Sequence, residues 1–255
     1  MFLRCQLQFQ YRYLDGLIRP PGVALVIGSS VHSAAEVNLV TKRDTGTPFS
    51  ADAVADLAAM HFDRRWSAEG EVELDEDEQS RGRDAVKGDA KDMSIKLTVL
   101  HAMDLVPRLQ PLHVERSVRV SIPGIRNELE GTFDLQTKDG KLHDLKTSGK
   151  KLDAASITDS VQMRLYNVLA EVADGKPPTK LALDVVQKTK TPSAYIVESP
   201  TFASSKPILD MIHRVEDIIE KGVFAPAEPT SWVCSKSYCG YFDTCPFGRS
   251  ARVTI

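Results

Sequence analysis

The sequence predicts a mixed α/β fold in which a mainly helical part precedes a sheet. Residues 112–122 alternate apolar and polar side chains, which is the pattern of a half-buried strand. An Asp-Gly pair at residues 139–140 lies between two further apolar stretches and indicates a tight hairpin. Stretches of helical length come before and after these strands, so helices and strands share one fold.

The helical part is expected to contain three helices, over residues 28–42, 51–66 and 94–109. The first begins at a Gly-Ser-Ser sequence that offers an N-cap, and the third ends before Pro111. Between the second and third helices, residues 69–92 are highly charged, and we expect a solvated loop or helix start there.

The sheet part follows, and its elements alternate between strand and helix. Strands are expected over residues 112–122, 129–137, 142–147, 181–188 and 194–198, and helices over residues 156–173 and 204–221. An irregular, Cys-rich tail comes after Phe224. We expect a single domain over residues 1–255, with residues 28–110 as its mainly helical part and residues 111–200 as its sheet core.

Composition narrows the class of protein. The 255 residues are 42% hydrophobic and 26% charged, which is enough to bury a full core. The formal net charge is −3, so a nucleic-acid binder of this composition must concentrate its basic residues locally. No apolar run reaches the roughly 18 residues of a membrane helix, and polar residues interrupt the N-terminus too early for a signal peptide. We therefore expect a cytoplasmic protein with no membrane partner.

Two aspartates and a lysine on the predicted hairpin form the first candidate site. Asp144 and Lys146 share one face of their strand because strand side chains alternate, and Asp134 lies on the preceding strand across the Asp-Gly turn. Two adjacent carboxylates repel unless a cation lies between them, and Mg²⁺ accepts such a pair while keeping water and substrate phosphate. A lysine beside the cation can orient or deprotonate an attacking water. The same spacing also occurs on ordinary solvated strand faces, so these residues alone decide nothing.

Four short motifs add weight to this site. In chain order they are Gly28-Ser29-Ser30-Val31-His32, Gly131-Thr132-Phe133-Asp134, Asp144-Leu145-Lys146-Thr147 and Gln162-Met163-Arg164-Leu165-Tyr166. Their order and spacing resemble the PD-(D/E)XK nucleases of the RecB and Cas4 type, including AddB-like iron–sulfur exonucleases. The resemblance spans nearly the whole chain, and it implies a restriction-endonuclease-like core with a mixed central sheet, an N-terminal helical insertion and a C-terminal Cys-rich cluster segment.

The resemblance also implies a role for each motif residue. The metal, Mg²⁺ or Mn²⁺, would be held by His32, Asp134, Asp144 and the backbone carbonyl of Leu145. An imidazole ligand favours Mn²⁺ somewhat. Lys146 would be the catalytic lysine.

Four more residues complete the candidate site. Gln162 and Tyr166 lie on one helical face and match the motif that contacts DNA and steadies the site. Glu36 shares a face with His32, and Glu115 lies on the first strand, where family members often have an acid. These two are further candidates.

The four cysteines are Cys5, Cys234, Cys239 and Cys245, one near the start and three near the end. By spacing they could form no site, two disulfides, a zinc site or an iron–sulfur cluster. Disulfides are rare in a reducing compartment, and the ending Cys-Pro fits a [4Fe–4S] cluster better than zinc. The resemblance to Cas4-like and AddB-like nucleases implies such a cluster, acting as a structural clasp between the chain ends.

The function implied is a metal-dependent DNA nuclease, an exonuclease acting on single-stranded DNA or DNA ends in repair or recombination. The alternative is a non-catalytic or complex-dependent DNA-binding subunit of a helicase–nuclease or CRISPR-adaptation assembly. The chain has no Walker-type Gly-x-x-x-x-Gly-Lys-Ser/Thr, so any motor would come from a partner such as a helicase, and a Cas1-like protein is a second candidate partner.

Overall fold

A five-stranded mixed sheet forms the centre of the fold in a computed structural model, which describes residues 1–68 and 71–250. The strands lie side by side in chain order, and only β3 and β4 are parallel. They are β1 Pro111–Val120, β2 Leu129–Thr137, β3 Leu142–Ser148, β4 Leu181–Gln187 and β5 Ser193–Ser199. The mixed α/β class expected from the sequence is therefore confirmed, and each strand lies within two residues of its predicted bounds.

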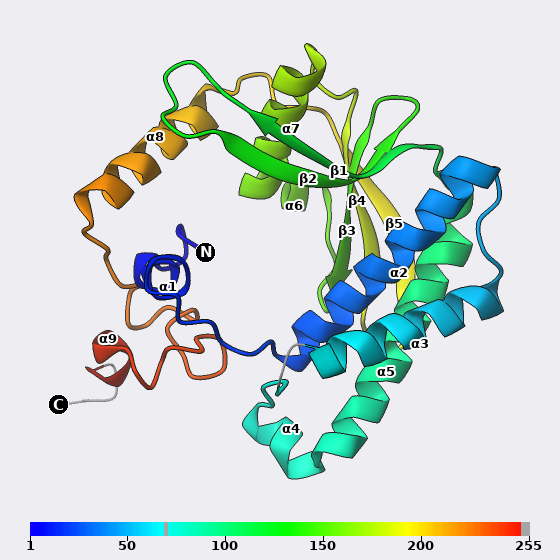
Figure 1. Ribbon diagram of the computed structural model, residues 1–255, viewed down its shortest axis with the longest axis horizontal. Helices are drawn as coiled ribbons and strands as arrows, with labels where there is room; N and C mark the ends of the chain where they lie inside the picture. The colour runs from blue at the N-terminus through cyan, green and yellow to red at the C-terminus, as the bar shows by residue number, and fades with distance from the viewer. Residues whose placement is uncertain (69–70, 251–255) are drawn as a thin grey trace. The chain divides into compact units, whose positions relative to one another are not determined.

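Helices cover both faces of this sheet (Figure 1). The parallel pairing of β3 and β4 requires a crossover, which runs through α6 (Ala154–Thr158) and α7 (Val161–Asp174) on one face. The opposite face carries α2 (Val23–Thr45), α3 (Ala51–Ala68) and α5 (Arg83–Leu100). The short helix α4 (Glu76–Arg81) precedes α5. The sheet thus has a different helical layer on each side.

Apolar side chains from three helices and two strands form the core on the α2 face. Val31, Phe62 and Leu97 are fully buried and belong to one cluster with Leu145 of β3 and Val186 of β4. Helix α2 is long and apolar enough to cross a membrane by length and composition only, and half of its most apolar 18-residue stretch is buried inside the fold. Such burial is also found for the core helix of a soluble domain.

Three of the predicted helices differ in extent from those in the structure. Helix α2 begins at Val23, five residues before the predicted start, because its first turn also packs into the core. Helix α5 begins at Arg83, inside the charged stretch, since Val86 and Ala90 give that stretch one apolar face. Beyond its end the chain continues as a π-helical turn, η2 (His101–Leu105), and a 3₁₀ turn, η3 (Val106–Arg108).

The third difference concerns the crossover between β3 and β4. The single helix predicted over residues 156–173 is two helices, because each segment has its own N-cap. The Asp153 carboxylate accepts a hydrogen bond from the Ser156 N–H (3.1 Å), and the Ser160 hydroxyl accepts one from the Met163 N–H (3.2 Å). The second cap starts α7 at Val161 and so sets where Gln162 and Tyr166 lie.

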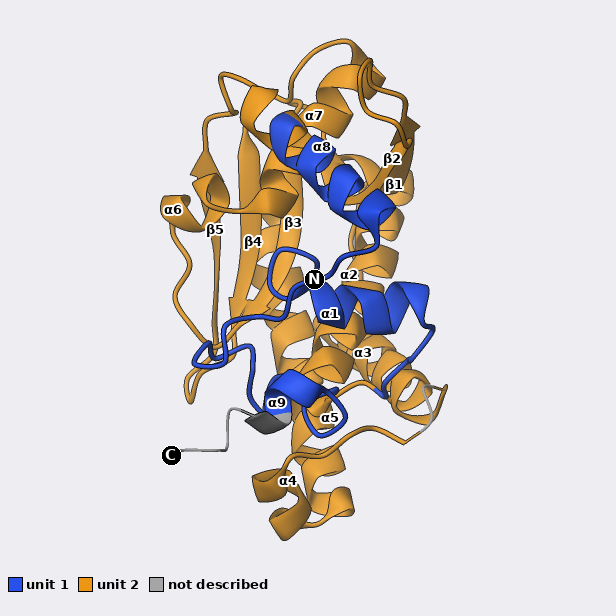
Figure 2. Ribbon diagram, turned by 90° about the vertical axis from the view of Figure 1, so that its left-hand side faces the viewer, with its two compact units in different colours: residues 1–20, 210–255 blue, residues 21–209 orange. Residues whose placement is uncertain are grey.

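The chain divides into two compact units (Figure 2). One comprises residues 21–209 and holds the sheet with its helices. The other comprises residues 1–20 and 210–255, and so joins the two ends of the chain. Its elements are α1 (Gln6–Phe9), the π-helical turn η1 (Gln10–Leu14), most of α8 (Lys206–Lys221) and α9 (Pro246–Ser250). Within it, the Tyr241 hydroxyl donates to the carbonyl of Leu17 (2.5 Å).

Candidate active site

The candidate site lies where β2 and β3 separate. The two strands pair only next to their hairpin, at Leu135↔His143 and Gln136↔Leu142. Beyond these pairs, β3 is hydrogen-bonded to β4, whereas β2 is hydrogen-bonded to β1. Asp134 is the first β2 residue beyond the paired region, and its Oδ2 accepts a hydrogen bond from the backbone N–H of Leu145 (2.8 Å). A carboxylate therefore occupies the gap between the strands.

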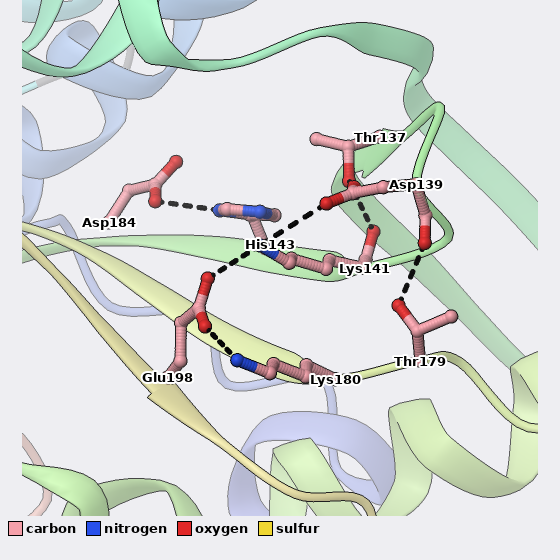
Figure 3. Close-up of polar contacts among 8 residues, drawn as sticks. All are labelled: Thr137, Asp139, Lys141, His143, Thr179, Lys180, Asp184 and Glu198. Atoms are coloured by element: carbon pink, nitrogen blue, oxygen red, sulfur yellow. Dashed lines mark hydrogen bonds and ion pairs between the residues drawn. The ribbon is translucent and has the colours of Figure 1, made fainter.

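Hydrogen bonds and ion pairs hold the hairpin end of β3. They fix this strand where it enters the fork, by which we mean the place where β2 and β3 separate. Gly140 has φ +81°, a conformation that suits glycine. Lys141 and Lys180 both form ion pairs with Glu198 of β5, with N–O distances of 2.7 and 2.5 Å (Figure 3). The Thr179 hydroxyl donates to the carbonyl of Asp139 (2.9 Å). The turn is thereby tied to the β4 and β5 side of the sheet.

Asp144 is 1% exposed and sits between two polar partners. Its Oδ2 lies 2.6 Å from Lys146 Nζ, and its Oδ1 accepts a hydrogen bond from Gln162 Nε2 (2.9 Å). Burial raises the pKa of Asp144 to about 6, although Lys146 opposes this shift, and Asp134 raises the pKa further. The negative charge on this carboxylate is therefore costly without a further cation nearby.

Gln162 connects the lysine, the aspartate and the tyrosine of the last motif. Its Oε1 accepts a hydrogen bond from Lys146 Nζ (2.9 Å), and its Nε2 also lies 2.9 Å from the Tyr166 hydroxyl. The Tyr166 ring meets Phe133 edge-on, with ring centroids 5.1 Å apart. Burial, followed by Asp144, raises the pKa of Tyr166, so this hydroxyl stays protonated. The i, i+4 spacing predicted for Gln162 and Tyr166 thus brings both to the aspartate–lysine pair.

His32 reaches the site from α2, on the other face of the sheet. Its Nδ1 lies 3.4 Å from Asp134 Oδ2, and its side chain lines a small cavity together with Asp134 and Leu145. Glu36 and Glu115 line the same cavity. Of the residues proposed from the sequence, these five therefore line one cavity. Asp144 instead contacts Lys146 and Gln162, on the α7 side, and Tyr166 contacts Gln162 there.

Glu115 shows both a strained backbone and a perturbed pKa. Its φ of +49° is the only positive value for a non-glycine residue in the described part of the chain, and such strain often marks functional positions. Burial raises the pKa of Glu115 to about 7, and Asp134, Glu36 and Asp144 add to the shift in that order. Carboxylates close enough to suppress one another's ionisation form a donor set that suits a divalent cation.

The donor types fit Mg²⁺ or Mn²⁺ better than softer metals, because they are carboxylate oxygens and one imidazole. Among residues 1–68 and 71–250, however, no three His, Cys, Asp or Glu side chains are arranged to hold a metal ion. The chemistry of the site therefore fits a cation, but the side chains would have to draw together around it.

The sequence reasoning missed three buried polar residues that line the same cavity. His143 and Asp184, which are 3% and 2% exposed, form a pair with Nδ1 and Oδ1 2.8 Å apart (Figure 3). His101 is 1% exposed, and burial lowers its pKa to about 4. Within the described residues, both nitrogens of His101 and Nε2 of His143 lack hydrogen-bond partners. The position of His143 directly before Asp144 was the available signal, but only strand pairing places Asp184 beside it.

The four cysteines line a second cavity, in the unit formed by the chain ends. All four are free thiols. Burial raises the pKa of Cys234, and the neighbouring thiols of Cys239, Cys245 and Cys5 raise it further. The backbone N–H of Ala227 donates to Cys5 Sγ (3.3 Å). Tyr11, Val233, Tyr241 and Phe242 also line the cavity, so the thiols have largely apolar neighbours. The fold thus brings together the four residues that the sequence proposed as one group.

Comparison with known proteins shows the family of the chain. A family model described as "PD-(D/E)XK nuclease superfamily" matches residues 1–246, and the chain belongs to this superfamily. No curated protein matches the sequence.

A solved structure with a TM-score above 0.5 supports the fold. A protein from Eubacterium rectale described as "Putative exonuclease" is similar with a TM-score of 0.57 and 12% identity, over 90% of this chain and 80% of that one. The structure of SSO0001 is similar with a TM-score of 0.38 and 14% identity, over 94% of this chain and 95% of that one, which is too weak to carry an argument.

Proposed function

We propose that this protein is a Mg²⁺- or Mn²⁺-dependent deoxyribonuclease, and that it is an exonuclease of the RecB and Cas4 type acting on single-stranded DNA or DNA ends. The observation that carries this proposal is the fork between β2 and β3. There Asp134 lies beside His32 on one side, and Asp144 contacts Lys146 and Gln162 on the other. The similar structure described as "Putative exonuclease" supports the exonuclease assignment.

The metal would be held by His32, Asp134, Asp144 and the carbonyl of Leu145, with Glu115 as a further oxygen donor. The pKa values of Glu115 and Asp144 are raised, and binding would displace any proton that they carry, because only the carboxylate forms are ligands. The bound cation would supply Lewis-acid polarisation of the phosphodiester and a lowered pKa of water.

Lys146 has the position expected of a group that handles the attacking water and the developing charge. Its Nζ contacts both Asp144 Oδ2 and Gln162 Oε1, and this pair of acceptors fixes the ammonium group on the same face as the aspartate. A fixed cation stabilises negative charge that develops on phosphate oxygens in the transition state. Gln162 and Tyr166 would hold Lys146 and Asp144 in place and present hydrogen-bonding groups to DNA.

We also propose that Cys5, Cys234, Cys239 and Cys245 hold a [4Fe–4S] cluster that clasps the two chain ends together. A four-iron cluster lies between four sulfurs rather than at one point, and cysteines around a cavity suit it. The Ala227 N–H that points at Cys5 Sγ is the type of donor that stabilises cluster sulfurs. Anaerobically purified protein should contain about four irons per chain, and Cys239→Ser should lose this iron and melt at a lower temperature.

The nuclease proposal is tested by digestion of end-labelled single- and double-stranded DNA with Mg²⁺ or Mn²⁺. Asp134→Ala and Lys146→Ala should abolish nucleotide release while the circular dichroism spectrum stays unchanged. Lys138→Ala removes an exposed lysine from the nearby hairpin turn and should cleave like the wild type. Full activity in both site variants, or release of nucleotides without a divalent cation, would contradict the proposal.

A further inference from the structure

A group of four lysines lies just beyond the candidate site. Because β3 and β4 are parallel, their carboxyl ends lie at the same edge of the sheet. The loops that follow them start side by side, since the N–H of Lys188 donates to the carbonyl of Ser148 (2.8 Å). These loops carry the residues that we call the lysine patch: Lys150, Lys151, Lys188 and Lys190.

The patch has no balancing charge in its own loops. Residues 145–152 and 185–192 contain five lysines, counting Lys146, and no aspartate or glutamate. Lys150, Lys151 and Lys190 are exposed, and Lys188 is half-buried. Within the described chain, none of the four patch lysines has a carboxylate within ion-pair distance.

Both loops are held by their own hydrogen bonds. The Ser148 hydroxyl donates to the carbonyl of Lys150 (2.8 Å) and accepts from its N–H (3.1 Å). The Thr189 hydroxyl donates to the carbonyl of Thr191 (2.7 Å), and the N–H of Leu152 donates to the Tyr195 hydroxyl (2.9 Å). The nearest acid in sequence, Asp153, uses its carboxylate as the N-cap of α6. The positive charges are therefore concentrated on a preformed surface.

We propose that the lysine patch binds the phosphate backbone of single-stranded DNA on the way to the active site. This inference rests on the proposed nuclease function. In a chain with a formal net charge of −3, such a local concentration of lysines is the feature that attracts a polyanion. Lys150 is four residues from Lys146, so their Cα atoms are at most about 13 Å apart at about 3.3 Å per residue. The patch therefore contacts phosphates within a few nucleotides of the bond to be cut.

Phosphate contacts of this kind give binding that depends strongly on salt and little on sequence. Each lysine that neutralises a phosphate of a single strand contributes about 0.7 to the slope of log K against log salt. The Lys150→Gln, Lys151→Gln, Lys188→Gln, Lys190→Gln variant should therefore lower the magnitude of this slope by about 3 if all four lysines engage the strand.

The experiment measures binding of a fluorescein-labelled 20-nucleotide oligo-dT by anisotropy, at several salt concentrations, in EDTA so that no cleavage occurs. The matched control replaces four other lysines that also have no ion-pair partner in the described structure, Lys87, Lys96, Lys138 and Lys176, by glutamine. It changes the net charge equally and should keep the wild-type slope. If the fourfold patch variant does not fold, the pairs Lys150→Gln, Lys151→Gln and Lys188→Gln, Lys190→Gln should each lower the slope by about 1.4.

An unchanged slope in a folded patch variant, or an equal loss in patch and control variants, would overturn the patch assignment. Nuclease activity of the wild type and its loss in Lys146→Ala are measured separately. Active wild-type protein with an unaffected slope refutes the patch alone. Wild-type protein that binds oligo-dT through the patch but never cleaves DNA refutes the nuclease assignment and keeps the patch.

Discussion

Replacing His101 by leucine should remove an acid-sensitive part of the free energy of unfolding. The His101 ring is 1% exposed, and neither of its nitrogens has a partner within the described residues. Burial lowers its pKa from 6.5 to about 4, while Asp184 raises it, and His32 and His143 lower it. The folded protein therefore keeps this imidazole neutral at pH values at which the unfolded chain binds a proton.

The sign and size of the effect follow from these two pKa values. Between pH 6.5 and 4 the unfolded state binds more protons, so stability falls as the pH falls. At 1.36 kcal/mol per pKa unit, the loss due to His101 is about 2 kcal/mol between pH 7.5 and 5, and about 3.4 kcal/mol over the complete window. The raised pKa values of Glu115 and Asp144 act in the opposite direction, but they are common to wild type and variant.

The assay is urea unfolding followed by circular dichroism at pH 7.5, 6 and 5, at constant ionic strength and without divalent cations. The gap in unfolding free energy between His101→Leu and wild type should change by about 2 kcal/mol in favour of the variant from pH 7.5 to 5. His113→Leu removes an exposed imidazole from β1 and should follow the wild type. If His101→Leu and wild type lose stability in parallel, His101 is not a buried neutral histidine and the reasoning is refuted.

Three further predictions concern other parts of the fold. Gly131→Ala would place a Cβ 2.5 Å from Leu169 Cδ1 and should lower the free energy of unfolding, measured in urea, by about 1–3 kcal/mol. Gly88→Ala lies in open space on α5 and should raise the same free energy by about 1 kcal/mol. Equal effects of the two substitutions would contradict the packing argument. Because the pKa of Glu115 is about 7, its deprotonation should raise the affinity for Mn²⁺ about tenfold from pH 6 to 8. In calorimetric titrations, Glu115→Gln should lose this tenfold increase. The same pH dependence in the variant and the wild type would exclude Glu115 from the site. Lys42 Nζ donates to the carbonyls of Val106 (2.7 Å), Pro107 (3.2 Å) and Leu109 (2.7 Å). Lys42→Met leaves these carbonyls without their donor and should lower the free energy of unfolding by about 3 kcal/mol. A melting temperature equal to that of the wild type would refute this prediction.

Local sequence determined the elements of this protein and most of its candidate site. Alternation and the Asp-Gly turn predicted the five strands to within two residues, because strand periodicity and turn chemistry are local properties. The same alternation put Asp144 and Lys146 on one face, and the helical spacing of Gln162 and Tyr166 put those two side chains together.

Tertiary structure decided what local patterns do not encode. Strands β2 and β3 separate because β2 pairs along its length with β1, whereas β3 pairs along its length with β4. This separation opens the gap that Asp134 occupies. Pairing of β3 with β4 over a long crossover sets Asp184 beside His143, and packing of η2 buries His101 against the same cavity. The sequence alone indicated most of the candidate site residues. Long-range pairing, which depends on contacts between residues far apart in the chain, decided the shape of the site and the buried histidines beneath it.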